Sequence, residues 1–216
     1  MPTIVLATQN PGKLAELRAM LEGSPVKVLG LADCPGSPFP EPPETGSTFL
    51  DNATIKARAY AGATGHTCLA DDSGLEVDAL DGAPGVISSH YCTDGREAGM
   101  PRDERDRANN EKLLAELAAV PLDRRTARFV CVMVLASPAG DVLATSRGTF
   151  EGRIGLPLTV DPDGVPRGAR GFGYDPLLLV ADGRTAAELT PDQKNTRSHR
   201  GQALRAILPA ILELTD

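Results

Sequence analysis

The chain has no long apolar run, which argues against a membrane-spanning helix. The apolar stretch at residues 130–136 falls far short of the ~18 consecutive apolar residues that such a helix needs. The first residues pass from Met1 and Pro2 directly into a strand-like segment at 4–7, without the basic start and cleavage site of a signal peptide. We therefore expect a cytoplasmic protein that does not contact membranes.

Cysteine is also scarce. The four cysteines, Cys34, Cys68, Cys92 and Cys131, are scattered, with no Cys-x-x-Cys pair and no histidine at zinc spacing. This pattern argues against a disulfide framework and against a structural zinc site. We expect four small, mostly buried thiols.

The chain has fewer basic than acidic residues, and its formal net charge is -7. A protein that coats DNA or RNA must neutralise many phosphates, so we expect no nucleic-acid partner. A small phosphorylated substrate remains compatible because it needs only a few local cations. Three of the five lysines lie in the segments that we consider functional: Lys13, Lys56 and Lys194.

What is present indicates an α/β fold. A chain of 216 residues can bury about 70% of the surface that it exposes when unfolded, enough for one α/β domain or two small lobes. Apolar periodicity predicts helices at 11–22, 47–62, 104–119 and 197–214 and strands at 4–7, 26–29, 67–70, 75–80, 126–135, 142–153 and 174–180. Residues 161–173, rich in Gly, Pro and Arg, predict a mobile loop. Helices alternating with strands, plus one antiparallel pair, predict a mixed sheet.

The turn between the first strand and the first helix is a candidate phosphate site. It contains six residues in sequence: Thr8, Gln9, Asn10, Pro11, Gly12 and Lys13. Backbone N–H groups and a lysine where a helix begins can hold phosphate oxygens. An ordinary strand-to-helix turn would have the same composition, and the pattern is not a Walker loop.

Two adjacent carboxylates, Asp71 and Asp72, follow the third predicted strand, in what reads as a turn. They are either a solvated acidic turn or a pair that binds magnesium and activates water. Neighbouring strand residues point to opposite faces, so we expect only one of them to face the site, and the spacing does not say which. Glu44 is a candidate second magnesium ligand. It precedes a predicted helix that carries Lys56 on its polar face.

Two further segments carry candidate binding groups. Phe172 and Tyr174 alternate with glycine before Asp175, as in a platform for stacking a base or as in aromatics at the edge of a core. His199 and Arg200 begin the last predicted helix. They can donate hydrogen bonds to a base or phosphate, or form a capping or ion pair.

Taken together and in order, these segments resemble the inosine/xanthosine triphosphate pyrophosphatase family. The resemblance covers nearly the whole chain and runs through 7–13, 44–46, Phe49, 52–53, 56–58, 70–75, 82–85, Asn109, 112–114, 171–176, 187–189, Lys194 and 198–201. Each motif alone is weak, and the ordered set is specific. The resemblance implies one domain over 1–216, with a long curved mixed sheet flanked by helices and an active-site cleft between two lobes. It also implies a homodimer.

The same resemblance implies a Mg²⁺-dependent hydrolase. It would cleave the α–β phosphoanhydride of non-standard purine nucleoside triphosphates (ITP, dITP, XTP) to give the monophosphate and pyrophosphate. Asp72 would be the general base and a metal ligand, with Glu44 as the second ligand. Ser73 would touch the substrate. The other contacts implied are Thr8, Gln9, Asn10, Pro11, Gly12, Lys13 and Lys56 for the phosphates, Phe172, Gly173, Tyr174 and Asp175 for the base and ribose region, and Lys194, His199 and Arg200 for the base edge and phosphates. His90 stands where relatives often carry Arg, and we assign it no role.

Two other functions remain open. A related pyrophosphatase for pyrimidine or modified nucleotides would share the phosphate chemistry but should lack the tail at 198–200. A non-catalytic nucleotide sensor would keep the binding residues and lose the carboxylates, yet Glu44, Asp71 and Asp72 are all present.

Overall fold

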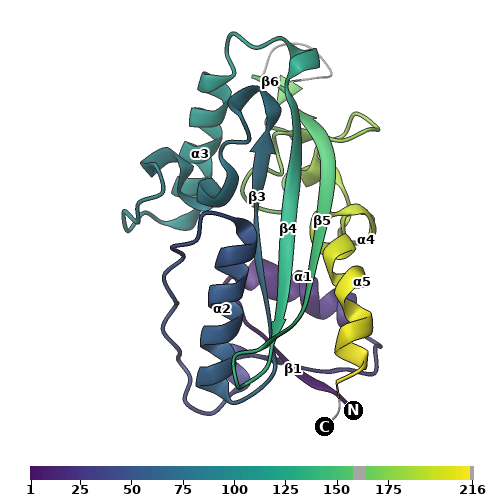
Figure 1. Cartoon of the computed structure of the whole chain (residues 1–216). Helices are drawn as coiled ribbons and strands as arrows, with labels where there is room; N and C mark the ends of the chain where they lie inside the picture. The colour runs from purple at the N-terminus through teal and green to yellow at the C-terminus, as the bar shows by residue number, and fades with distance from the viewer. Residues whose placement is uncertain (158–163, 215–216) are drawn as a thin grey trace. The chain divides into compact units, whose positions relative to one another are not determined.

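A computed structural model describes residues 1–157 and 164–214 (Figure 1). The chain forms two compact units. The first unit comprises Met1–Asp72, Cys131–Thr149 and Asn195–Asp216, and the second comprises Ser73–Val130 and Phe150–Lys194. In the described part of the chain, no helix is long and apolar enough to cross a membrane.

A six-stranded sheet has the order β2-β1-β3-β4-β5-β8. Its strands are β1 (Thr3–Leu6), β2 (Lys27–Gly30), β3 (Cys68–Val77), β4 (Thr126–Ala136), β5 (Val142–Ile154) and β8 (Leu178–Leu179). β1 pairs in parallel with β2 and β3, whereas β8 is antiparallel to β5, so the predicted mixed sheet is confirmed. β6 (Leu156–Pro157) and β7 (Gly164–Val165) form a separate parallel pair.

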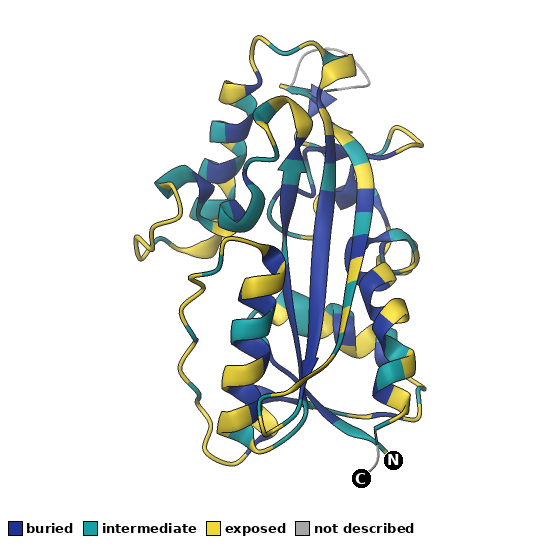
Figure 2. Ribbon diagram, viewed as in Figure 1, coloured by how far each residue is buried: buried dark blue, intermediate teal, exposed yellow. Residues whose placement is uncertain are grey.

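The first unit buries both faces of its strands. Alternation sends Ile4 and Leu69 into one core with α1 (Pro11–Leu21) and α5 (His199–Leu212). It sends Val5 and Ala70 into a second core with α2 (Phe49–Thr64). Figure 2 shows that α2 and α5 each have a buried and an exposed side. This two-sided burial fixes the strand register, because a slip of one residue would exchange the two cores.

The second unit packs α3 (Arg102–Glu116) over a core that includes Leu75, Phe129, Phe150 and Tyr174. Short 3-10 helices lie at Leu31–Asp33 in the first unit and at Asp78–Leu80, Gly85–Thr93, Leu122–Arg124 and Ala186–Glu188 in the second. Buried Arg125 donates hydrogen bonds to the carbonyls of Leu117, Val120 and Gly155. The bonds to Leu117 and Val120 satisfy carbonyl groups just beyond the end of α3.

The prediction of two strands separated by a turn at Asp71 and Asp72 is wrong. β3 is continuous, and both carboxylates lie inside it. Aspartate is normally depleted in strands. Here each carboxylate has a cationic partner within the fold, which removes the need to turn out toward solvent.

The predicted C-terminal helix at 197–214 is confirmed as α5. A short helix that was not predicted, α4 (Pro191–Arg197), precedes it, and Ser198 separates the two. Ser198 is extended, and its hydroxyl accepts a hydrogen bond from the Gly201 N–H at 3.1 Å, so it begins a new helix.

Other boundaries differ less. The strand expected at 174–180 is reduced to β8, because the residues before it form turns. The helix predicted at 47–62 is confirmed as α2, and a capping box of Thr48 and Asp51 begins it. Of the loop expected at 161–173, residues 161–163 lie outside the described part of the chain, and β7 and turns occupy the rest.

Candidate active site

Asp71 and Asp72 point to opposite faces of β3, as strand geometry requires. Asp71 Oδ2 lies 3.0 Å from Lys13 Nζ on α1. Asp72 Oδ1 lies 2.9 Å from Lys56 Nζ on α2. All of these residues belong to the first unit. Two adjacent residues of the same type therefore enter two different environments.

On the Asp72 side, one lysine bridges two carboxylates. Lys56 Nζ also lies 3.1 Å from Glu44 Oε1. Asp72 is buried, whereas the Glu44 side chain is 36% exposed. Asn52, one helical turn before Lys56, donates a second hydrogen bond to Asp72 at 3.3 Å. The group thus combines a buried carboxylate, a half-exposed carboxylate and a cation between them.

The local backbone explains how Glu44 reaches this group. The Gly46 N–H donates to the Asn52 side-chain oxygen at 2.8 Å. A Cβ at Gly46 would overlap the side chains of Asp51 and Asn52, so only glycine allows this approach. The capping box of Thr48 and Asp51 then fixes where α2 begins.

The buried position changes the proton affinity of these groups. Burial raises the pKa of Asp72 above its ordinary value, and the Lys56 and Lys13 ammonium groups offset only part of that rise. For Lys56, burial lowers the pKa, but the carboxylates of Asp72 and Glu44 outweigh burial and raise it. Lys56 therefore stays protonated, while Asp72 is a stronger base than an exposed aspartate.

The carboxylates of this group suit a hard divalent cation. Among residues 1–157 and 164–214, no cluster of three or more His, Cys, Asp or Glu side chains could hold a metal ion by itself. Mg²⁺, however, is commonly held by one or two carboxylates together with waters and substrate phosphates. Glu44 and Asp72 already converge on one cation, the Lys56 ammonium, so their oxygens fit such a role.

The Asp71 side is a series of alternating charges that is buried at its centre and partly exposed at both ends. Arg200 Nη2 lies 3.3 Å from Asp71 Oδ2, and Arg200 Nη1 donates to Glu16. The side chains of Asp71 and Arg200 are each 1% exposed. We call this series, Glu16–Arg200–Asp71–Lys13, the ion chain. Attraction to the two carboxylates outweighs burial and raises the pKa of Arg200, which keeps it charged.

The turn before α1 is ordered by its own side chains. Asn10 Oδ1 accepts hydrogen bonds from the N–H groups of Gly12 and Lys13 at 3.0 and 3.2 Å. Thr8 Oγ1 accepts from the Asn10 N–H, and Pro11 occupies the first turn of the helix. Since Asn10 already occupies two of the N–H groups, a phosphate would rely first on the partly exposed Lys13 ammonium.

Gln9 and His199 also have defined places in the first unit. The Gln9 amide donates to the Phe39 carbonyl and to the Tyr60 hydroxyl, at 2.9 and 3.1 Å. His199 is buried at the first position of α5. Neither placement tests the predicted contact with a nucleotide, and both contacts stay predictions.

In the second unit, Phe172, Asp175 and Lys194 form one cluster. Asp175 Oδ2 accepts the Phe172 N–H at 2.8 Å and lies 2.7 Å from Lys194 Nζ. The Lys194 ammonium and the Arg102 guanidinium both lie over the Phe172 ring, at 5.2 and 4.9 Å from its centroid. A Cβ at Gly171, whose φ is +76°, would collide with the Asp175 carboxylate. Asp175 therefore organises the loop from inside.

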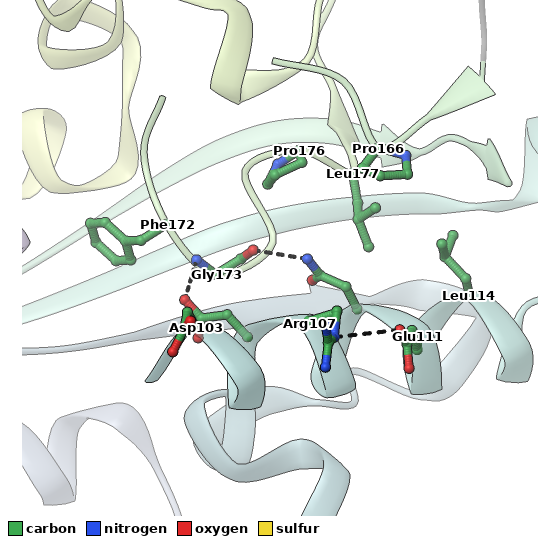
Figure 3. A pocket seen from close by; sticks show the side chains of 11 residues that line it. Asp103, Arg107, Glu111, Leu114, Pro166, Phe172, Gly173, Pro176 and Leu177 are labelled. Carbon is green, nitrogen blue, oxygen red and sulfur yellow. Dashed lines mark hydrogen bonds and ion pairs between the residues drawn. The ribbon is translucent and has the colours of Figure 1, made fainter. Parts of the chain in front are cut away.

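Helix α3 holds the same loop from the other side. Asp106 accepts the Gly173 N–H at 2.9 Å, and Asn110 donates to the Gly173 carbonyl at 3.2 Å. A cavity of about 500 Å³ lies between α3 and the loop, lined by residues such as Asp103, Leu114 and Phe172. Figure 3 shows Phe172 and Gly173 across from Asp103, Arg107 and Glu111 of α3.

The remaining predicted residues have simpler placements. Tyr174 is buried in the core of the second unit, and its hydroxyl donates to the Ser88 carbonyl at 2.8 Å. A buried ring offers no free face, which leaves Phe172 as the candidate for stacking. Ser73 follows Asp72 in β3 and is partly buried.

His90 belongs to a separate surface cluster. Its Nε2 lies 2.9 Å from Glu97 and 3.1 Å from Arg105, and its Nδ1 lies 2.9 Å from the Ser89 hydroxyl. These partners include no residue that we predict to bind a nucleotide.

Sequence reasoning missed several residues that organise the site. Glu16 lies one helical turn after Lys13, and that spacing was the signal for a shared helix face. Asp106 and Asn110 lie four residues apart on α3, which also places them on one helix face. Their partner, the Gly173 peptide, is 63 residues away from Asn110 in the sequence, so only the fold could reveal the contact.

Comparison with known proteins identifies the family of the chain. Residues 4–210 match the Ham1 family. The chain is 51% identical to a dITP/XTP pyrophosphatase of Nitratidesulfovibrio vulgaris, over 95% of this chain and 94% of that protein. It is 47% identical to a dITP/XTP pyrophosphatase of Nocardia farcinica, over 100% of this chain and 98% of that protein.

Solved structures show the same relation. A HAM1 protein from Coxiella burnetii superposes with a TM-score of 0.81 at 40% identity, over 99% of this chain and 100% of that one. A dITP/XTP pyrophosphatase from Mycobacterium abscessus superposes with a TM-score of 0.70 at 45% identity, over 96% of this chain and 99% of that one. The chain belongs to the Ham1 family.

Proposed function

We propose that the chain hydrolyses non-standard purine nucleoside triphosphates, such as ITP, dITP and XTP, to the monophosphate and pyrophosphate. The observation that carries the proposal is the group in which Lys56 bridges Glu44 and Asp72. It provides a base, a cation and a second carboxylate at one place. The dITP/XTP pyrophosphatases of similar sequence support the same substrate class.

Asp72 is our candidate general base. Its raised pKa brings it closer to the working pH than an exposed aspartate. It would orient a water toward the α-phosphorus and take its proton, while the bond to the β-phosphate oxygen breaks and pyrophosphate leaves. Lys56 stays charged beside it and would offset negative charge that develops on the phosphates.

Glu44 and Asp72 are the residues that would hold Mg²⁺. When bound, the ion would neutralise phosphate charge and withdraw electrons from the reacting phosphorus. Lys56 would then exchange part of its contact with these carboxylates for the substrate. The partial exposure of Glu44 suits such a rearrangement.

Lys13 is our candidate contact for the rest of the triphosphate, with the turn from Thr8 to Gly12 placing it. Its ammonium is partly exposed, while its carboxylate partner is buried. A charge that keeps one side toward solvent can still attract an anion. Ser73, next to Asp72, is a candidate hydroxyl contact.

Recognition of the base and ribose falls to Phe172, Gly173, Tyr174, Asp175 and Lys194, with His199 and Arg200 expected at the base edge. Phe172 would stack on the base, and Lys194, fixed by Asp175, would donate toward a keto oxygen. An adenine amino group at the same position would face a donor, a mismatch that costs affinity. The cleft between lobes, the homodimer and the cytoplasmic location implied by the resemblance stay predictions.

The test is a pyrophosphate-release assay with inosine, xanthosine, guanosine, adenosine and deoxythymidine triphosphates, each with Mg²⁺ and with a chelator. We expect kcat/KM for the first two to exceed that for adenosine triphosphate by roughly a hundredfold. We also expect the chelator to abolish turnover. Preference for the thymidine nucleotide would favour a pyrimidine pyrophosphatase, and tight binding without turnover would favour a sensor.

A further inference from the structure

The ion chain contains two buried charges, Asp71 and Arg200, that have no role in the proposed hydrolytic step. Asp71 lies beside the candidate base but on the opposite face of β3, toward α1 and α5. Arg200 directs Nη1 at Glu16 and Nη2 at Asp71, and it is 1% exposed. Both of these guanidinium nitrogens therefore serve carboxylates inside the first unit.

We propose that Asp71 and Arg200 are positioning residues, which hold the Lys13 ammonium where it binds the triphosphate of the substrate. This inference rests on the proposed function, because it assigns a role within the same phosphate site.

The ion chain restricts the position of the Lys13 ammonium. A lysine carries its charge on a flexible four-carbon stem, so an unsupported ammonium samples many positions. Asp71 lies on a central strand and is anchored by Arg200. Arg200 in turn contacts Glu16, which lies on the same helix as Lys13. The contacts form a closed path from α1 through α5 and β3 back to α1.

The ion chain also limits how far Asp71 neutralises the charge of Lys13. A carboxylate that served Lys13 alone would neutralise it and reduce its attraction for phosphate. Here Asp71 Oδ2 is shared between Lys13 at 3.0 Å and Arg200 at 3.3 Å. Lys13 is therefore oriented by Asp71 but only partly neutralised, so it keeps positive potential for an anion.

The test is a double-mutant cycle on tripolyphosphate binding, measured by calorimetry with the full chain and Mg²⁺. We expect Asp71→Asn to weaken tripolyphosphate binding by about tenfold, the size of one charged hydrogen bond. We expect Lys13→Ala to weaken it at least as much. If Asp71 acts through Lys13, the double variant binds as Lys13→Ala alone does. Arg200→Met should behave like Asp71→Asn in both backgrounds.

Two further variants guard the interpretation. Asp71→Glu keeps the charge but moves the carboxylate by one methylene, and it serves if Asp71→Asn does not fold. It should weaken binding only while Lys13 is present. Arg18→Met, which removes an exposed ion pair with Asp33 on the same helix, is the matched control and should leave binding unchanged.

Multiplicative losses in the double variant would overturn the proposal, because they would mean that Asp71 acts independently of Lys13. Tighter binding by Asp71→Asn, or failure of the unchanged chain to bind tripolyphosphate, would also overturn it. The proposed hydrolysis fails separately, since binding is measured without turnover. Coupling between Asp71 and Lys13 in a chain that hydrolyses no purine triphosphate would retain the positioning role alone.

Discussion

Asp71 and Asp72 are neighbours with the same side chain, yet they sit in opposite environments. Asp71 is held by two cations, Lys13 and Arg200, within the ion chain. Asp72 has one cation, Lys56, which it shares with a half-exposed Glu44. The difference arises from the alternation of a single strand, which assigns one carboxylate to α1 and α5 and the other to α2.

The comparison separates a structural charge from a reactive one. A buried carboxylate with two cationic partners is costly to alter, because its loss leaves a buried cation without that partner. A buried carboxylate whose pKa is raised can accept a proton during a reaction. We therefore expect substitutions at Asp71 mainly to affect stability and phosphate binding, and substitutions at Asp72 mainly to affect turnover.

The largest expected effect is on catalysis by Asp72→Asn. The amide cannot take a proton from water and is a poorer ligand for Mg²⁺. We expect kcat for inosine triphosphate to fall by about 10²–10⁴-fold, with an unchanged circular dichroism spectrum. Asp71→Asn should lower kcat less. A loss within about tenfold, or ~1.4 kcal/mol of barrier, would contradict the assignment of Asp72 as the base.

The second effect is on stability, for which we expect Asp71 to matter more than Asp72. Asp71→Asn leaves the buried Arg200 with Glu16 as its remaining partner in the ion chain, so we expect the free energy of unfolding to fall by about 3 kcal/mol. Asp72→Asn should cost less, because Lys56 retains Glu44. Urea denaturation of both variants measures the difference. Equal losses would show that the two sides of β3 are energetically alike.

The third effect concerns pH. Asp72 must be ionised to act, so kcat/KM should be present above its pKa and lost as the pH falls through it. Burial raises that pKa above 3.8, so the acid loss should begin at higher pH than for an exposed aspartate. Lys56→Met removes a cation that lowers this pKa and should move the acid limb further up. The pH profile of kcat/KM is measured for the unchanged chain, for Lys56→Met and for Lys27→Met as the control. An acid limb that does not move in Lys56→Met would contradict the coupling between Lys56 and Asp72.

The smallest expected effect tests whether burial determines how much stability is lost with an ion pair. Arg18 and Asp33 pair at 2.7 Å, closer than Lys13 and Asp71, but their side chains are 47% and 48% exposed. Exposed ion pairs contribute little, so Arg18→Ala should lower the free energy of unfolding by at most about 1 kcal/mol. A loss equal to that of Asp71→Asn would show that distance, not burial, sets the cost.

The sequence allowed much of the fold to be predicted, because the signals were local. The capping box at Thr48 and the apolar periodicity of α1, α2 and β4 need only near neighbours. The continuity of β3 through Asp71 and Asp72 could not be predicted in this way. It depends on Lys13, Lys56 and Arg200, which reach the strand from three different helices.

In the candidate site, too, only the features that depend on near neighbours in the sequence could be predicted. Strand alternation predicted that the two carboxylates would face different ways, and the structure confirms it. Which face carries which partner depends on the packing of distant helices. The same reason hid Asp106 and Asn110, whose hydrogen bonds to the Gly173 peptide join residues more than sixty positions apart.

Helix α1 supplies both the first and the last member of the ion chain, Glu16 and Lys13, within one turn. Transient opening of this short helix would release both ends together, long before the whole protein unfolds. Occupancy of Lys13 by a phosphate should therefore slow amide hydrogen exchange along α1 more than along α2. The frequency with which this helix opens would then determine how often Lys13 is in position to bind the substrate.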